Sequence, residues 1–315
     1  MYDLVIIGHA AAGPAAAIYA ARRNLNLVIL TKDVGGEVAL SGEVENWPSV
    51  IHTTGIELAN AFHEHTKSYN VPIEQGLEVT GIQQEKNHHI VIAKDFAGNE
   101  KKYETKSVVI ATGIHPRKLG VPGEDKLKGR GVTSCTVCDG PLFKNKITAT
   151  VGAGNSALES VLMMGGIAQK VYLLTKYDQS DLNGGFPRGE NILIDKAKKL
   201  QNLEIIYNAD TIEILGDNAV SGLKYRDLKT GEEKHIEVSA AMIHIGMIPN
   251  SDFATRLTKN NNKEIEIDML CRTNVPGIFA AGDVTNIPYK QISISVGMGA
   301  TAALSAIDYL NHWQE

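Results

Sequence analysis

Residues 4–13 read LVIIGHAAAG, and an alanine-rich run that ends in Arg22 and Arg23 follows them. An apolar run, a glycine turn and a helix-forming stretch predict a strand, a tight turn and a buried helix. The apolar residues 27–30 predict a second strand, which completes a β-α-β unit. In such a unit a pyrophosphate binds at the amino end of the helix, where backbone N–H groups are unpaired. The opening stretch therefore predicts a dinucleotide-binding turn.

The same order of elements recurs in the second half of the chain. Residues 147–157 read ITATVGAGNSA, and another apolar strand is predicted after the helix that follows them. Gly8 and Gly152 are 144 positions apart, and Thr31 and Thr175, which follow the second strand of each copy, keep that spacing. One glycine-rich turn is a weak signal that is often only structural, but two copies in one register favour a duplicated nucleotide-binding module.

A second repeated motif marks where each module ends. The sequence GIHP at 113–116 follows one apolar strand, and GMIP at 246–249 follows another. The apolar strand 277–283 lies beyond the second of these exits and is predicted to return to the first domain. The prediction is an α/β fold with two Rossmann-like dinucleotide-binding domains, the second inserted into the first. The expected limits are 1–116 and 250–315 for the first domain and 117–249 for the second.

Such turns need small residues at particular places. Gly8 and Gly152 permit the tight bend, while Gly13 and Ala157 permit close packing of the helix. Ala10 stands where the middle glycine is expected in the first copy, so its methyl group lies where the backbone approaches a pyrophosphate. We therefore expect some strain in the first turn.

The composition is that of an ordinary globular chain of 315 residues, because 43% hydrophobic and 21% charged residues exclude a disordered protein. A formal net charge of -5 gives no general attraction to nucleic acid or to anionic lipid. The apolar run at 10–21 is too short to span a membrane, and the first residues lack the basic region of a signal peptide. We therefore expect a cytoplasmic protein that binds neither nucleic acid nor membrane.

Cys135 and Cys138 form a C-x-x-C pair in the second module. A single helical turn brings residues at this spacing within disulfide distance. The alternative is half of a zinc site, but no second C-x-x-C or close Cys/His pair supplies the other ligands, and no metal is predicted. Asp139, next to the pair, is either a solvated loop carboxylate or a proton shuttle to a departing thiolate.

The third cysteine and the paired histidines are predicted to have no chemical role. Cys271 is expected to be a buried structural residue. His63 with His65, and His88 with His89, are expected to be solvated, because the first pair does not share a helix face and the second lies in a polar turn.

Short motifs along essentially the whole chain point to one family. They are GPAAA (13–17), GGE (35–37), ENWP (45–48), ATG (111–113), CTVCD (135–139), GNSA (154–157) and AGD (281–283). This set resembles the low-molecular-weight bacterial thioredoxin reductases and, equally, the reductase portion of the alkyl hydroperoxide reductase flavoprotein. The resemblance implies a homodimeric flavin-dependent disulfide oxidoreductase with FAD in the first domain and a pyridine nucleotide in the second. Electrons would pass from a donor through FAD and the Cys135–Cys138 pair to thioredoxin or a similar protein disulfide.

The resemblance also implies roles for individual residues. Asp283 would hold the flavin ribitol, while Gln291 and Ile292 would lie along the isoalloxazine ring. Cys138 would face the flavin, and Cys135 would be exchanged onto the partner disulfide. The other residues assigned to cofactor binding are Gly8, Ala10, Gly13, Pro14, Gly35, Gly36, Glu37, Asn46, Thr112, Gly113 and Lys290 in the first domain, and Gly152, Gly154, Asn155, Ser156, Ala157 and Lys176 in the second.

The segment after the second strand of the second module departs from this family. NADPH-dependent members carry an arginine-rich stretch there, which binds the 2′-phosphate, whereas residues 175–181 read TKYDQSD. A carboxylate at the strand end would bind the ribose hydroxyls of NADH, but Thr175 stands there instead. Lys176 is either a phosphate contact or a solvated loop lysine.

The identity of the electron donor therefore stays open between NADH, NADPH and ferredoxin. We expect NADH first and ferredoxin second, because the arginines are missing after the strand, unless Lys176 or Arg188 in the longer following loop replaces them. A dithiol oxidase that passes electrons to oxygen and a catalytically silent flavin-binding protein are further alternatives. The intact cysteine pair disfavours the silent protein.

Overall fold

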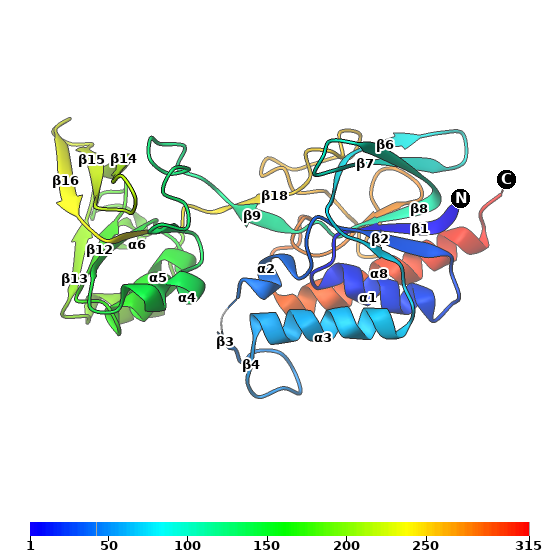
Figure 1. Cartoon of the computed structure of the whole chain (residues 1–315), viewed down its shortest axis with the longest axis horizontal. Coiled ribbons are helices and arrows are strands. Elements are labelled where there is room, and N and C mark those ends of the chain that lie inside the picture. The colour runs from blue at the N-terminus through cyan, green and yellow to red at the C-terminus, as the bar shows by residue number, and fades with distance from the viewer. Residues whose placement is uncertain (42, 315) are drawn as a thin grey trace. The chain divides into compact units, whose positions relative to one another are not determined.

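The computed structural model describes residues 1–41 and 43–314, and it divides into two compact units. The first unit combines Met1–His115 with Ile248–Glu315, and the second unit is Pro116–Met247. Each unit has its own sheet (Figure 1), and each has its own hydrophobic core.

The first unit is built on a mixed sheet. β1 (Tyr2–Ile7) pairs in parallel with β2 (Leu27–Leu30) on one side and with β8 (Glu100–Ile110) on the other. β19 (Ile278–Ala280) also pairs in parallel with β8, so the late strand returns to this sheet as predicted. The sheet continues with β5 (Ile73–Glu74) beyond β2 and with the antiparallel strands β7 (His89–Asp95) and β6 (Leu77–Gln84) beyond β8.

Two helices, α1 (Ala12–Ala21) and α8 (Ile292–Asn311), lie side by side in the first unit (Figure 1). Their backbones are close, because a Cβ on Gly299 would lie only 2.1 Å from the carbonyl oxygen of Ala12. α8 is long and apolar enough to cross a membrane, but Met298 and Ala302 are buried in the core that it shares with α1. α8 is therefore a core helix.

A further helical layer of the first unit lies beside the first glycine turn. α3 (Gly55–Ser68) begins with a capping box, in which the Thr54 hydroxyl accepts from the Glu57 N–H and the Glu57 carboxylate accepts from the Thr54 N–H. The short elements before it are α2 (Gly36–Ala39), β3 (Glu43–Val44) and β4 (Thr53–Thr54).

The second unit contains a parallel sheet and an antiparallel sheet. The parallel sheet has the order β10 (Val132–Thr133), β17 (Ala240–Ile243), β11 (Ile147–Val151), β12 (Lys170–Leu174) and β13 (Leu203–Ile206). The antiparallel sheet has the order β14 (Ala209–Leu215), β15 (Gly222–Asp227) and β16 (Glu233–Glu237). The helices are α4 (Thr136–Asp139), the 3-10 turn η1 (Gly140–Phe143), α5 (Asn155–Gly165), α6 (Leu182–Gly185) and α7 (Asn191–Lys198).

Both predicted β-α-β copies are present, as β1-α1-β2 and β11-α5-β12, and the predicted α/β class is confirmed. The two Gly-x-x-Pro exits lead into β9 (Ile114–Pro116) and β18 (Met247–Pro249), which pair with each other. The strand predicted at 277–283 is shorter, because β19 ends at Ala280 and Gly282 takes the left-handed conformation with φ of 77°.

Candidate active site

The first glycine turn follows β1 and leaves no room for side chains. A Cβ on Gly8, which has φ of 106°, would lie 2.3 Å from the carbonyl oxygen of Ala111. A Cβ on Gly13 would lie 2.0 Å from the carbonyl oxygen of Gly8. No side chain caps α1, so its first N–H groups face the turn without a side-chain partner. This is the cradle that a pyrophosphate needs.

Ala10 is not among the described residues with positive φ, so its backbone conformation does not require glycine. Its methyl group faces a second glycine loop, since a Cβ on Gly36 would lie 3.3 Å from the Ala10 Cβ. The N–H of Gly35 donates to the carbonyl oxygen of His9 at 2.7 Å. The glycine pair thus lets the loop that carries Glu37 fold onto the first turn.

Two carboxyl groups of the first unit hold their protons more tightly than usual. Burial raises the pKa of Asp283, whose carboxylate accepts a hydrogen bond from Ser295 Oγ at 3.0 Å. Burial also raises the pKa of Glu37, and the nearby His115 offsets part of this effect. Both carboxyl groups lie close to the first glycine turn. Both can form hydrogen bonds with the hydroxyl groups of a ligand.

The start of α8 is tied to the ENWP segment. Asn46 Nδ2 donates to Gln291 Oε1 at 3.1 Å, and Gln291 is the N-cap of α8, whose first residue is Ile292. Lys290 Nζ lies 2.8 Å from the Glu264 carboxylate, so its charge is already paired within the first unit. Of the residues predicted here, Asn46 and Gln291 are brought into contact.

The end of β8 carries the ATG motif. Thr112 Oγ1 donates to the carbonyl oxygen of Asn250 at 2.7 Å, and Asn250 Nδ2 donates back to the carbonyl oxygen of Thr112 at 2.8 Å. Gly113 has φ of 64°, which a glycine adopts without strain. Pro14 is buried within α1. These contacts fix the strand end next to the first turn.

The second glycine turn, between β11 and α5, is as closely packed as the first. A Cβ on Gly152 would lie 2.1 Å from the carbonyl oxygen of His244 and 2.8 Å from the Ala157 Cβ. Gly154 is the N-cap of α5 and makes no side-chain cap, while Ser156 in the first turn of the helix is exposed. The second turn therefore also requires glycine and leaves the start of α5 without a side-chain cap.

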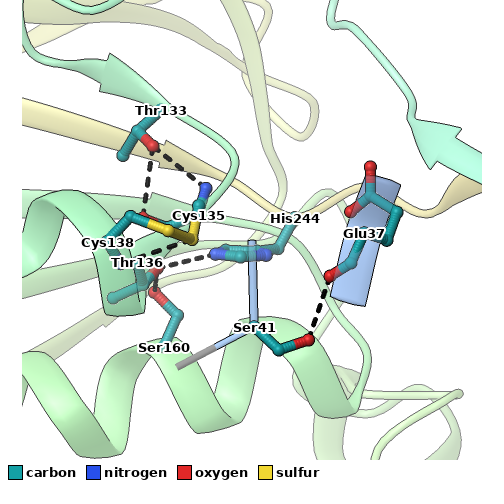
Figure 2. The surroundings of a disulfide bond; sticks show 8 residues. All are labelled: Glu37, Ser41, Thr133, Cys135, Thr136, Cys138, Ser160 and His244. Atoms are coloured by element: carbon teal, nitrogen blue, oxygen red, sulfur yellow. Dashed lines mark hydrogen bonds between the residues drawn. A yellow bond between two sulfur atoms is a disulfide. The ribbon is translucent and has the colours of Figure 1, made fainter. Parts of the chain in front are cut away.

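The cysteine pair lies at the start of α4 in the second unit. Cys135 and Cys138 form a disulfide with a Cα–Cα distance of 5.4 Å, which confirms that one turn brings them together (Figure 2). The N–H of Cys138 donates to Cys135 Sγ at 3.3 Å, and the N–H of Cys135 donates to Thr133 Oγ1 at 2.9 Å. Asp139 is half-buried at the end of α4.

The sulfur atoms are bound to each other, so the zinc alternative has no thiolate ligands in this state. No group of three His, Cys, Asp or Glu side chains that could hold a metal ion occurs within the described parts of the chain. A C-x-x-C disulfide in a chain with two glycine turns of the dinucleotide type is suited to thiol–disulfide exchange that is coupled to a bound cofactor.

Comparison with known proteins supports this interpretation. The sequence pattern of the pyridine nucleotide-disulphide oxidoreductase family matches residues 2–304. The chain belongs to this family. It is 40% identical over 310 residues to an alkyl hydroperoxide reductase subunit of Staphylococcus aureus, and the match covers 98% of this chain and 59% of that relative. The chain therefore spans somewhat more than half the length of that protein.

Two solved structures extend the comparison to the fold of this oxidoreductase. Thioredoxin reductase from Lactococcus lactis has a TM-score of 0.85 and 34% identity, with 99% of this chain and 100% of that chain covered. A ferredoxin-flavin thioredoxin reductase from Clostridium acetobutylicum has a TM-score of 0.52 and 30% identity, with 99% and 98% covered. The chain is thus a thioredoxin reductase-like disulfide oxidoreductase of a family that depends on FAD.

In this oxidoreductase the loop after β12 folds back onto the second glycine turn. Arg188 forms a parallel backbone bridge with Gly154. Asn155 Oδ1 accepts from the Glu190 N–H, and Asn155 Nδ2 donates to Glu190 Oε1, both at 2.8 Å. Arg188 is one of the two cations that the sequence offers in place of the missing arginines. Glu190 is not part of the site predicted from the sequence, because it lies far along the loop from the strand end.

Most side chains at the end of β12 are engaged within the protein. Thr175 is buried, and its hydroxyl donates to the carbonyl oxygen of Gly185 at 3.1 Å. Lys176 is exposed, and its Nζ lies 6.0 Å from the centroid of the Tyr177 ring. The carboxylate of Asp178 is paired with Lys229. Apart from Lys176, a side chain that contacts a ligand of the second glycine turn would therefore come from further along the loop.

The expectation that the paired histidines are solvated is wrong for His89. β7 begins at His89, and the alternation of the strand places it on the buried face with Val91 and Ala93. His89 Nε2 lies 3.2 Å from the carbonyl oxygen of Pro276. His63 is half-buried and meets His9 edge to face, with 5.2 Å between ring centroids.

The remaining cysteine, Cys271, is buried as predicted.

His9 makes the first glycine turn sensitive to acid. It is 3% exposed, and neither ring nitrogen has a hydrogen-bond partner among the described residues. Burial, together with the nearby His63, lowers the pKa of His9 to about 4 from a usual value of 6.5. Between these two values the unfolded chain binds a proton that the folded chain does not, so stability falls as the pH is lowered from 6.5 to 4.

We expect His9→Ser to remove part of this acid sensitivity. The slope attributable to one such histidine is at most about 1.4 kcal/mol per pH unit. Urea unfolding at pH 7 and at pH 5 measures it, with the substitution of the exposed His235 by serine as the control. An equal loss of stability in the His9→Ser variant and the wild type would rule out His9 as the source.

Proposed function

We propose that this chain transfers electrons from a soluble donor through FAD and the Cys135–Cys138 disulfide to a protein disulfide, thioredoxin or a similar protein. The observation that carries the proposal is a C-x-x-C disulfide on α4 within a unit that also contains a nucleotide-type glycine turn. We propose further that the first unit is the FAD domain, that the second is the pyridine-nucleotide domain, and that the enzyme is a cytoplasmic homodimer.

The first unit offers a fitting set of residues for FAD. Gly8 and Gly13 leave a cradle without side chains at the start of α1, where the pyrophosphate would bind. Asp283, which follows β19, would bind the ribityl hydroxyls. Asn46 and Gln291, already in contact, would lie along the ring system. FAD bound there would supply the two-electron chemistry that reduces a disulfide.

The protein's own step is thiol–disulfide exchange. In the reduced pair, the Cys135 thiolate attacks one sulfur of the partner disulfide, which forms a mixed disulfide and releases the other partner sulfur as a thiolate. Cys138 then loses its proton and attacks Cys135 Sγ, which restores the intramolecular disulfide and releases the second partner thiolate. Asp139, the residue next to Cys138, would accept the Cys138 proton and pass it to the departing thiolate. The partner gains two electrons and the pair loses two.

The surroundings of the pair support a protein substrate. Val137 is 43% exposed and Leu142 is 77% exposed, and both follow Cys135 within α4 and η1. Exposed apolar side chains beside a reactive pair are suited to contact a protein surface. A small hydrophilic disulfide would not require them.

We propose NADH as the first candidate for the electron donor and ferredoxin as the second. The strand end has neither arginines nor a free carboxylate, while Glu190 lies against the second turn. The similarity to a ferredoxin-flavin thioredoxin reductase supports the second candidate. Anaerobic stopped-flow mixing with NADH, NADPH or reduced ferredoxin, monitored by loss of flavin absorbance, distinguishes the three. Reoxidation by oxygen without any disulfide substrate would instead favour a dithiol oxidase.

We expect the purified protein to carry tightly bound FAD and Gly13→Ala to lose most of it. The added methyl group would meet the Gly8 carbonyl oxygen, which cannot move without opening the turn. Gly81→Ala is the matched control, because the nearest atom to a Cβ there is 4.0 Å away. The ratio of flavin to protein absorbance gives the FAD content. A colourless wild-type protein that FAD cannot reconstitute would exclude the proposal.

A further inference from the structure

A chain of buried polar side chains lies next to the disulfide in the second unit. Thr136 Oγ1 lies 2.8 Å from His244 Nε2 and 2.7 Å from Ser160 Oγ, and Ser160 Oγ lies 3.1 Å from Thr150 Oγ1. Thr136 is 4% exposed, Ser160 3% and Thr150 0%. Figure 2 shows the His244 ring directed at Thr136, the residue that follows Cys135. The elements joined are α4, α5, β11 and the segment after β17.

The hydrogen bonds of this chain all run in one direction. Burial lowers the pKa of His244 to about 4, so its ring is neutral near pH 7, and the tautomer with its hydrogen on Nε2 can donate. His244 Nε2 then donates to Thr136 Oγ1, Thr136 Oγ1 donates to Ser160 Oγ, and Ser160 Oγ donates to Thr150 Oγ1. Thr136 and Ser160 each donate one hydrogen bond and accept one, and such a buried network fixes the groups that it joins.

The fixed group is the turn that carries the sulfur atoms. Thr136 is the first residue of α4, and the N–H of Cys138 on the same turn donates to Cys135 Sγ at 3.3 Å. A thiolate is stabilised by N–H groups aimed at it, and this stabilisation depends on their orientation. The hydrogen bonds of the Thr136 hydroxyl anchor the turn that carries this N–H.

We propose that His244, acting through Thr136, is a positioning residue that holds the Cys138 N–H against Cys135 and so stabilises the Cys135 thiolate. The inference deepens the proposed function and rests on it for its biological meaning. Its physical content concerns only side chains of the second unit. It assigns a role in the redox pair to a histidine 108 positions away from Thr136 along the chain.

The test uses the full flavin-loaded chain carrying Cys138→Ala, which keeps the N–H of residue 138 and leaves Cys135 as the accessible thiol. Cys271 does not interfere, because it is 3% exposed and burial raises its pKa to about 11. Iodoacetamide is added at a series of pH values, and modification of the Cys135 peptide is followed by mass spectrometry. Asp139 and His244, the titratable neighbours along this network and turn, stay intact in every Thr136 variant.

Thr136→Val removes the hydroxyl at constant shape, and Thr136→Ser retains it. A weakened hydrogen bond to a charged sulfur changes the thiolate population by about tenfold, so we expect the midpoint of the pH–rate curve to rise by about one unit in the valine variant. Because a more basic thiolate is also a better nucleophile, the rate below the midpoint falls by only about threefold. The serine variant should match the parent protein.

His244→Leu and His244→Gln form the second pair, because glutamine retains an N–H donor where leucine has none. Thr148→Val is the control for loss of a buried hydroxyl on the same strand as Thr150, since Thr148 Oγ1 has no hydrogen-bond partner among the described residues. Flavin content and thermal unfolding establish that each variant is folded. The proposal predicts a shift in the valine and leucine variants that serine and glutamine restore.

Equal pH–rate curves for Thr136→Val and Thr136→Ser would overturn the inference, as would an equal shift in Thr148→Val. Turnover of a protein disulfide by the protein with both cysteines tests the proposed function separately. A shifted curve in a protein that reduces no disulfide would support the positioning role and reject the function. An unshifted curve in an active enzyme would do the reverse.

Discussion

Replacing Cys138 with serine is expected to lower protein-disulfide reduction by about a thousandfold or more, the scale of loss seen when a nucleophile is removed from an enzyme. A single cysteine can still form a mixed disulfide with the partner through Cys135, but no second thiol remains to resolve it. Loss of flavin absorbance on mixing with the donor should proceed at the wild-type rate, because that step precedes the disulfide. Stopped-flow reduction and steady-state turnover measure the two halves separately.

Cys271→Ser is the matched control for this experiment. The Cys271 thiol is buried in the first unit, where it lies 3.6 Å from the carbonyl oxygen of Met298, and it belongs to no redox pair in the described part of the chain. We expect the control to retain disulfide turnover. Turnover of the Cys138→Ser enzyme at the wild-type rate would show that electrons reach the partner by another route.

The two nucleotide turns could be predicted from sequence because their geometry depends on local constraints. Gly8 and Gly152 occupy positions where a Cβ would collide with backbone atoms, and that requirement leaves glycine in the sequence at a fixed spacing. The cysteine pair was predictable for the same reason, since one helical turn determines the distance between residues three apart. Each of these features is decided within a few residues.

The parts of the site that the sequence did not indicate depend on contacts between distant segments. Glu190 reaches Asn155 only because the loop after β12 bridges back to Gly154 through Arg188. His244 meets Thr136 because β17, which precedes His244, pairs with β10, which precedes Thr136, in the parallel sheet. His89 follows a polar stretch of sequence, but it is the first residue of a strand whose inner face is buried. Neither the composition nor the spacing of residues along the sequence indicates which of these distant residues come into contact.

NADH is expected to reduce the enzyme about a hundredfold more efficiently than NADPH, measured as kcat/KM. Hydrogen bonds from arginine to a 2′-phosphate contribute on the order of 1.5 to 3 kcal/mol each, and the two or more that NADPH requires are missing after β12. Losing two such bonds corresponds to roughly 3 to 6 kcal/mol, or about a hundredfold or more. NADH loses nothing by their absence, because its ribose needs only hydroxyl contacts.

The charges around the second glycine turn also favour NADH over NADPH. The Glu190 side chain is held by Asn155 at the amino end of α5, and partial burial together with the charge of Glu190 raises the pKa of Glu159 on the next turn. Two neighbouring carboxylates would repel a dianionic 2′-phosphate, whereas they can accept hydrogen bonds from a ribose diol. Glu190→Gln should therefore raise kcat/KM for NADPH by about fivefold to tenfold and lower it for NADH, since about 1 to 1.4 kcal/mol separates the two cases.

The cations that could reverse this preference are Lys176 and Arg188, both exposed. Arg188 is the closer candidate because its backbone is bridged to Gly154. Arg188→Ala and Lys176→Ala are therefore measured beside Glu190→Gln with both nucleotides, and binding of ADP-ribose and of 2′-phospho-ADP-ribose is measured by calorimetry on the same proteins. A wild-type preference for NADPH that disappears in Arg188→Ala would show that one loop arginine replaces the missing cluster. If neither nucleotide reduced the enzyme and ferredoxin reduced it rapidly, the only role of the second unit would be to carry the disulfide.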